Sequence, residues 1–110
     1  MQEIKFLVQG SADEPYKVTF RKSESNFTAL CDCPAGQNGM YCKHRLRIIE
    51  GLSENIVSNN SSEIKIVRSW LSGSDVENAI EELKEAEREL ELVKKKVSNY
   101  KKKLARKMID

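Results

Sequence analysis

The sequence predicts an α+β fold, in which a small antiparallel β-meander and a helix precede a long C-terminal coiled-coil helix. Three observations support this prediction. Residues 1–31 contain three stretches in which apolar and polar side chains alternate. All three cysteines and the single histidine fall within fourteen consecutive positions. From residue 74 onward, apolar residues recur in heptads without a proline or glycine.

Short turns separate the three alternating stretches, so we expect them to pair as an antiparallel meander. The predicted strands span residues 3–9, 16–21 and 27–31. Gly10–Pro15 and Ser23–Asn26 are rich in the residue types that form turns.

After the strands, the sequence predicts a loop and then a helix. Residues 33–39 contain proline, glycine and asparagine, which predicts a loop. Helical spacing of apolar residues begins at Cys42, and Gly51 is a typical C-terminal stop.

A connector and a short helix are expected next. Residues 52–61 end in a polar run that is typical of a connector. Ile64, Val67 and Leu71 fit a short amphipathic helix, although the alternation of Ile64 and Ile66 also fits a strand. We therefore expect three parts, residues 1–51, 52–73 and 74–110.

The last part carries the signature of one long helix. Ser74 and Glu77 form a capping-box pattern at its start. About 35 helical residues would extend about 50 Å. The predicted coiled-coil interface residues are Val76, Leu83, Leu90, Val93, Val97, Tyr100 and Leu104. Such a stripe favours a homodimer or a partner protein helix, and a solvent-exposed single helix is the alternative.

The net charge of the chain is +2, but the charges are distributed unevenly along the sequence. Residues 1–74 carry +1, residues 75–92 carry −6 and residues 93–110 carry +7. Parallel pairing of two such helices would place like charges together, whereas antiparallel pairing places opposite charges together. We therefore predict an antiparallel homodimer.

Size and composition exclude several classes of protein. A chain of 110 residues is too short for a large enzyme core. No apolar run approaches the ~20 residues of a membrane span, and the N-terminus lacks the basic-then-apolar layout of a signal peptide. We expect a cytoplasmic protein with no membrane partner.

The cysteines and the histidine occur as two pairs, Cys31-Asp-Cys33 and Cys42-Lys-His44, separated by eight residues. Zinc prefers four such donors in a tetrahedron, and three cysteines with one histidine are a common structural set. An odd cysteine count argues against a disulfide framework. A transient redox pair of Cys31 and Cys33, or three ordinary buried thiols, are the alternatives.

The stretch CDCPAGQNGMYCKHRLRII resembles the SWIM-type zinc finger. The proline after the second cysteine, the lysine between the third cysteine and the histidine, and the apolar residues that follow all match that motif. The resemblance covers roughly residues 16–51 and implies a β-hairpin, then a helix, with one zinc ion on Cys31, Cys33, Cys42 and His44. SWIM modules are thought to bind DNA or proteins.

A shell filled by four protein donors makes the zinc structural, because catalytic zinc needs an open position. The only histidine is then a ligand, which leaves no base for a nucleophilic pair. We expect a non-enzymatic interaction module. A nucleic-acid-binding protein that uses Lys43, Arg45, Arg47 and the C-terminal lysines is the alternative.

Overall fold

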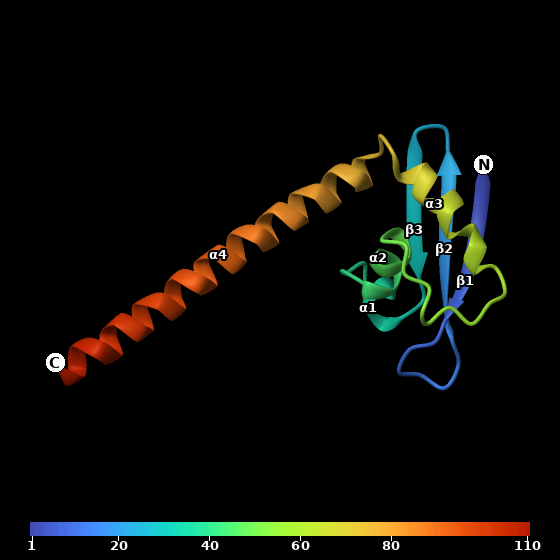
Figure 1. Ribbon diagram of the computed structural model, residues 1–110. Helices are drawn as coiled ribbons and strands as arrows, with labels where there is room; N and C mark the ends of the chain where they lie inside the picture. The colour runs from blue at the N-terminus through green and yellow to red at the C-terminus, as the bar shows by residue number, and fades with distance from the viewer. The chain divides into compact units, whose positions relative to one another are not determined.

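The computed structural model describes the whole chain, residues 1–110, which folds into two units, residues 1–77 and residues 78–110 (Figure 1). The first unit holds a three-stranded sheet with its helices, and all of the second unit except Asp110 lies within one long helix. The predicted α+β class is confirmed.

Three antiparallel strands form the sheet in the order β1, β2, β3, which confirms the meander. They span Gln2–Val8 (β1), Tyr16–Ser23 (β2) and Asn26–Cys31 (β3). Because alternate side chains of a strand point to opposite faces, the apolar set gathers on one face of the sheet. Phe6, Val18 and Phe20 have no exposed surface and form the centre of the core.

The predicted loop after β3 is wrong in part, because Pro34–Gln37 form a single helical turn, α1. Proline is favourable in the first turn of a helix, where its missing N–H is not needed. Cys33 precedes the turn as its N-cap, and its sulfur accepts a hydrogen bond from the N–H of Gly36.

The predicted helix after Cys42 is confirmed as α2, Lys43–Ile49. Ile48 and Ile49 are its buried residues. Beyond its end, Gly51 adopts a positive φ of 92°. The N–H of Leu52 reaches the carbonyl of Arg47 at 2.9 Å, and that of Gly51 reaches the carbonyl of Ile48 at 2.9 Å. This is the hydrogen-bond pattern of a Schellman motif, which requires the left-handed residue that glycine supplies.

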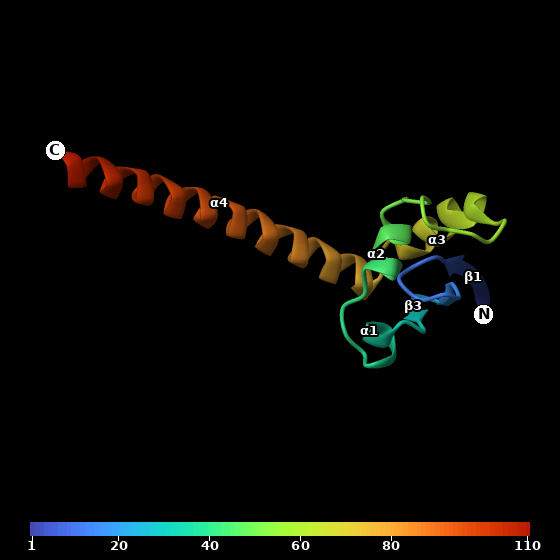
Figure 2. The same cartoon turned by 90° about the horizontal axis from the view of Figure 1, so that it is seen from below.

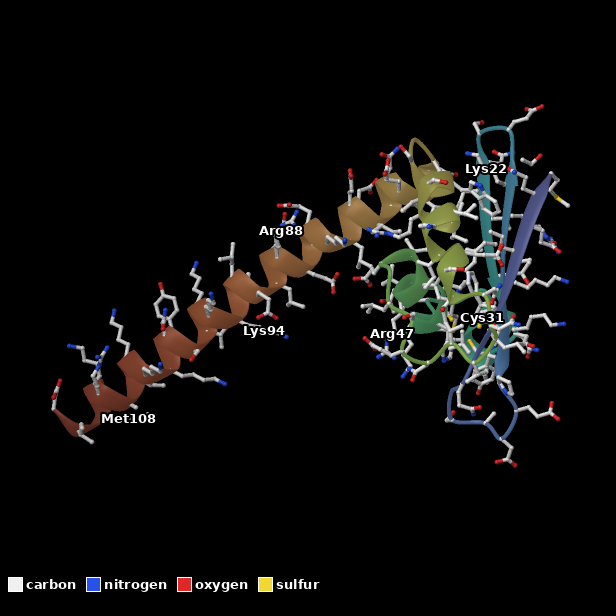
Figure 3. The ribbon with its side chains drawn as sticks, turned by 45° about the vertical axis from the view of Figure 1, so that its right-hand side comes forward. Lys22, Cys31, Arg47, Arg88, Lys94 and Met108 are labelled. Atoms are coloured by element: carbon white, nitrogen blue, oxygen red, sulfur yellow. The ribbon has the colours of Figure 1, made fainter.

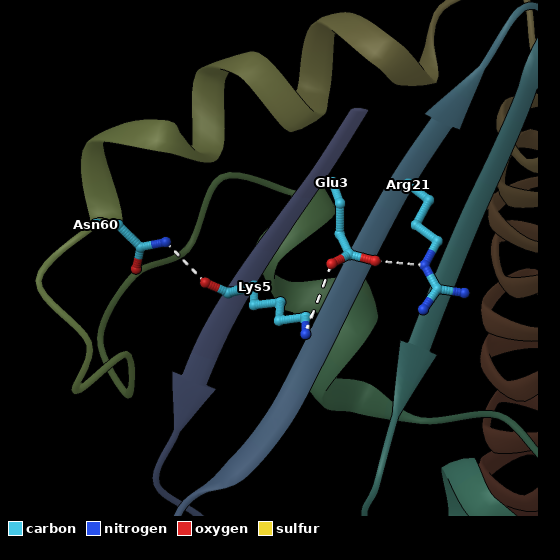
Figure 4. Close-up of polar contacts among 4 residues, drawn as sticks. All are labelled: Glu3, Lys5, Arg21 and Asn60. Atoms are coloured by element: carbon cyan, nitrogen blue, oxygen red, sulfur yellow. Dashed lines mark hydrogen bonds and ion pairs between the residues drawn. The ribbon is translucent and has the colours of Figure 1, made fainter. Parts of the chain in front are cut away.

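The segment after α2 covers the outer edge of β1. Ile56 forms a β-bridge with Val8, and the N–H of Val57 donates to the carbonyl of Leu7 at 2.8 Å. Farther along, the side-chain amide of Asn60 donates to the carbonyl of Lys5 at 2.7 Å (Figure 4). These bonds satisfy backbone groups that an edge strand would otherwise leave unpaired.

A 3₁₀ turn, Ser61–Glu63, leads into α3, Ile64–Leu71, so the helical alternative for this segment is correct and the strand alternative is wrong. Ile64, Val67 and Trp70 are its buried residues. Helices α2 and α3 lie on the same side of the sheet (Figure 2). They cover the apolar face that the strands present.

The last helix, α4, spans Asp75–Ile109, and its 35 residues confirm the predicted long helix. The hydroxyl of Ser74 accepts a hydrogen bond from the N–H of Glu77 at 3.2 Å. In return the Glu77 carboxylate accepts from the N–H of Gly73 at 3.1 Å, one residue earlier than a regular capping box. None of the helices is both long enough and apolar enough to cross a membrane.

Candidate metal centre

Four potential metal ligands meet where β3, α1 and α2 come together. Cys31 ends β3 (Figure 3), Cys33 and Cys42 are the N-caps of α1 and α2, and His44 lies in the first turn of α2. Their donor atoms all lie within 4.8 Å of one another, and the three cysteines are buried. The structure therefore brings together all four residues that the sequence predicts as zinc ligands.

The distances among the donors fit a tetrahedral zinc shell. With Zn–S near 2.3 Å and Zn–N near 2.0–2.1 Å, the edges of the tetrahedron would be about 3.8 Å between sulfurs and about 3.5 Å from sulfur to nitrogen. The sulfurs of Cys33 and Cys42 are 3.4 Å apart. Nδ1 of His44 lies 3.5 Å from the Cys42 sulfur and 3.8 Å from the Cys31 sulfur. All three cysteines are free, and 3.4 Å is far longer than the ~2.05 Å of a disulfide bond.

The pKa values of Cys42 and His44 are shifted toward the protonation states that bind a metal. Burial raises the pKa of the Cys42 thiol, but the N–H of Arg45 and the neighbouring donors outweigh burial, so that pKa is lowered overall. Burial, together with the charges of Lys43 and Arg47, lowers the pKa of His44. A thiolate and a neutral imidazole are the forms that bind zinc.

Cys31 behaves in the opposite way, because burial raises the pKa of its thiol to about 12. Such a thiol stays protonated at neutral pH unless a metal ion deprotonates it. A zinc ion bound among these donors would therefore have to displace the proton of Cys31. The donor set fits one structural zinc ion.

Two glycines that sequence reasoning treated only as loop or turn residues shape the centre. A Cβ at Gly36 would lie 2.3 Å from the carbonyl oxygen of Cys31, so only glycine allows α1 to approach β3. A Cβ at Gly10 would lie 2.6 Å from Cε2 of Tyr16 and 3.2 Å from Nε2 of His44. The Tyr16 and His44 rings pack with their centroids 5.0 Å apart. Only the presence of glycine at these positions could have signalled this role.

We expect Gly36→Ala to destabilise the zinc-loaded finger by about 3 kcal/mol, because the added methyl group overpacks against a fixed backbone carbonyl. Gly39→Ala is the matched control, since a Cβ at Gly39 would meet no atom within 4 Å and only its φ of 69° opposes alanine. That conformation costs about 1 kcal/mol. Thermal unfolding of both zinc-loaded variants measures the difference. Equal losses would contradict the steric role of Gly36.

A cavity of about 620 Å³ opens beside the centre. Its lining residues are Gln9, Gly10, Ser11, Tyr16, Cys33, Pro34, Ala35, Tyr41, Cys42, Lys43, His44, Arg47 and Asn55. Lys43 and Arg47, both predicted nucleic-acid contacts, are its charged residues besides the ligands, and no carboxylate lines it.

Other basic residues of the finger make contacts within the chain. The guanidinium of Arg45 donates to the carbonyls of Ala29 at 3.2 Å and Met40 at 2.6 Å. Nε of Arg21 donates to Glu3 at 2.6 Å on the outer face of the sheet (Figure 4). The Arg45 contacts tie β3 to the segment before α2.

The predicted coiled-coil residues lie along α4, whose side chains project away from the helix axis over its whole length (Figure 3). Val76 is half-buried, and the other six are exposed. No residue of this helix is buried within the chain. From Leu83 to Leu104, the stripe is therefore exposed in a single chain.

Comparison with known proteins supports the identity of the metal centre. Residues 6–50 match the family model described as SWIM zinc finger. No curated protein and no solved structure matches the chain. The matched segment runs from within β1 to the end of α2 and includes all four donors. Residues 6–50 thus match the SWIM zinc finger, with a Cys₃His set that fits one structural zinc ion.

Proposed function

We propose that this protein is a non-enzymatic interaction module in which a zinc-stabilised finger is carried on a helical arm that pairs with a second copy of the chain. The finger accounts for residues 1–77 and the arm for most of α4. Binding, rather than catalysis, is the function of both parts.

The main support for this proposal is the exposed apolar stripe of α4. None of the 35 residues of this helix is buried within its own chain. Leucine, valine and tyrosine nevertheless recur on it in heptads, from Leu83 to Leu104. Burying such a stripe against a partner helix is the established way in which a heptad pattern is stabilised.

Charge supports antiparallel pairing of two copies. The acidic block, residues 75–92, carries −6, and the basic block, residues 93–110, carries +7. Two antiparallel helices place each block beside its opposite, whereas two parallel helices place each beside its like. A second copy of this chain therefore has the charge pattern that the arm requires.

The finger supports a binding role because its ligand set leaves no open position on a zinc ion. His44 is the only histidine, and its Nδ1 faces two of the sulfurs. It is thus committed to the metal and does not serve as a general base. The alternative partners are a helix of another protein, which would pair with the arm, and a nucleic acid, which would bind the lysines.

Sedimentation velocity of the zinc-loaded chain, with and without a short DNA duplex, tests the proposal. We expect a dimer at micromolar concentration and no change when the duplex is added. A monomer that sediments with DNA, with an affinity that falls steeply as salt rises, would replace this proposal by the nucleic-acid alternative. A monomer that does not bind the duplex would contradict self-association and would favour a helix of another protein as the partner.

A further inference from the structure

We infer that two copies of α4 pair in one specific antiparallel register, which places Leu90 of one chain opposite Val93 of the second copy. This inference rests on the proposed self-association and adds to it the identity of the facing residues. Three features of the helix lead to this register: its core positions, its flanking charges and the charge clashes of the neighbouring registers.

The core residues pair well in size in this register. Each heptad has two apolar core positions. In an antiparallel pair, the first of these positions in one helix faces the second in the other helix. Around the central Leu90 and Val93, the facing pairs are Leu83 with Tyr100, Ala86 with Val97, Ala79 with Leu104, and Val76 with Lys107 of the second copy. Both alanines face a larger residue, the alternation of sizes that fills a core without voids. At each end, the aliphatic stem of Lys107 covers Val76 while its charge reaches water.

Within α4, the charged residues that face one another beside the core are oppositely charged. The facing pairs are Glu87 with Lys94, Glu89 with Lys96, and Glu82 with Lys103 of the second copy. The two-fold symmetry of the dimer makes each pair occur twice. Charges at these positions set the orientation and partner choice of coiled coils.

These charged side chains are available for a partner. Of the six, only Lys94 forms an ion pair within the chain, at 3.5 Å from Glu91. The others have no ion-pair partner in a single chain. A second copy would therefore supply the first ion-pair partner for five of the six.

The neighbouring arrangements bring like charges together. A shift of one heptad in one direction places Glu87 and Glu89 opposite their own copies. A shift in the other direction does the same to Lys94 and Lys96. Parallel pairing sets Glu82 against Glu87 and Lys96 against Lys101 of the second copy.

This register has a consequence for the fingers. Its centre lies between Leu90 and Val93, so the N-termini of the two α4 helices, where the fingers attach, lie about 50 Å apart. Each end of the paired helices would then be joined to one zinc finger. If a target has two matching sites, binding of one finger would raise the effective concentration of the other finger at the second site.

Distances between spin labels test the register. A nitroxide coupled to a ketone side chain leaves the zinc ligands free, and the variants are Asn78→p-acetylphenylalanine and Arg106→p-acetylphenylalanine. Both residues are exposed and lie outside the apolar stripe. In the zinc-loaded full chain, the axial separations should be about 40 Å for the label at residue 78 and about 43 Å for that at residue 106.

Other arrangements give different pairs of distances. The two shifted registers predict about 30 and 54 Å, or about 51 and 33 Å. A parallel dimer predicts less than about 20 Å for both labels, because helix axes in contact are 8–10 Å apart. A dimer with any of these distances would overturn the register while leaving self-association intact. A monomer by sedimentation would overturn both.

Charge transposition provides an independent check of the flanking pairs. The triple variant K94E/K96E/K103E places acid against acid at all three pairs and should weaken dimerisation at least tenfold. Adding E82K/E87K/E89K to the same chain restores opposite charges at each pair, so dimerisation should recover. If the sixfold variant stays as weak as the triple variant, these residues do not face one another.

Discussion

Cys42→Ser is expected to leave residues 1–77 unfolded at neutral pH. The Cys42 sulfur lies 3.4 Å from that of Cys33 and 3.5 Å from Nδ1 of His44, so its loss opens the shell that joins β3, α1 and α2. Structural zinc contributes about 10–16 kcal/mol of apparent binding free energy at neutral pH. That is as large as the whole free energy of unfolding of a typical domain, about 5–15 kcal/mol. Near-ultraviolet circular dichroism of the buried Trp70 measures the loss.

Tyr41→Ser is the matched control for this variant. Tyr41 precedes the ligand directly but is 67% exposed, so its replacement should leave both zinc content and the unfolding temperature close to those of the unchanged chain. Removing zinc from the unchanged chain with a chelator should reproduce the Cys42→Ser spectrum. If Cys42→Ser kept one zinc and the original unfolding temperature, the metal would not stabilise the fold.

Leu90→Asp is expected to convert the dimer into a monomer. Leu90 is the central core residue of the proposed interface, and each dimer contains two copies of it. Burying a leucine side chain stabilises by about 1.5–3 kcal/mol, so the two copies account for about 3–6 kcal/mol. The dissociation constant should therefore rise about 140- to 20,000-fold. Sedimentation equilibrium over a range of concentrations measures it.

Leu92→Asp is the control that separates the interface from general effects of charge. Leu92 is exposed on the same helix two residues away, but it lies outside the apolar stripe. The same substitution there should change the dissociation constant by less than about fivefold, because surface substitutions usually cost no more than about 0.5 kcal/mol each and the dimer contains two copies. Equal effects of the two variants would mean that the stripe is not the contact surface.

Local patterns predicted most of the elements of the first unit. Alternation in β1 and β2 identified both the strands and the side chains that form the core, because one buried face imposes a period of two. The ligand spacing likewise identified the zinc site, since Cys-x-Cys and Cys-x-His place two donors within one turn or bend. The capping box at Ser74 correctly marked the start of α4.

Features that depend on distant residues escaped prediction. Proline and glycine in residues 33–39 favoured a loop, whereas the packing of Gly36 against Cys31 supports a helical turn. The cover on the edge of β1 depends on a hydrogen bond between Leu7 and Val57, fifty residues apart in the chain. Nothing in a local pattern indicates such a pairing. For the same reason, the contacts of Arg45 with the backbone carbonyls of Ala29 and Met40 could not be predicted.

A native mass spectrum of the full chain, purified without chelator, measures zinc binding and dimerisation together. The number of chains and the zinc content are read from the same ion. We predict two chains with two zinc ions. A metal-free monomer would contradict the account, because neither the finger nor the arm would then have the partner that its residues require.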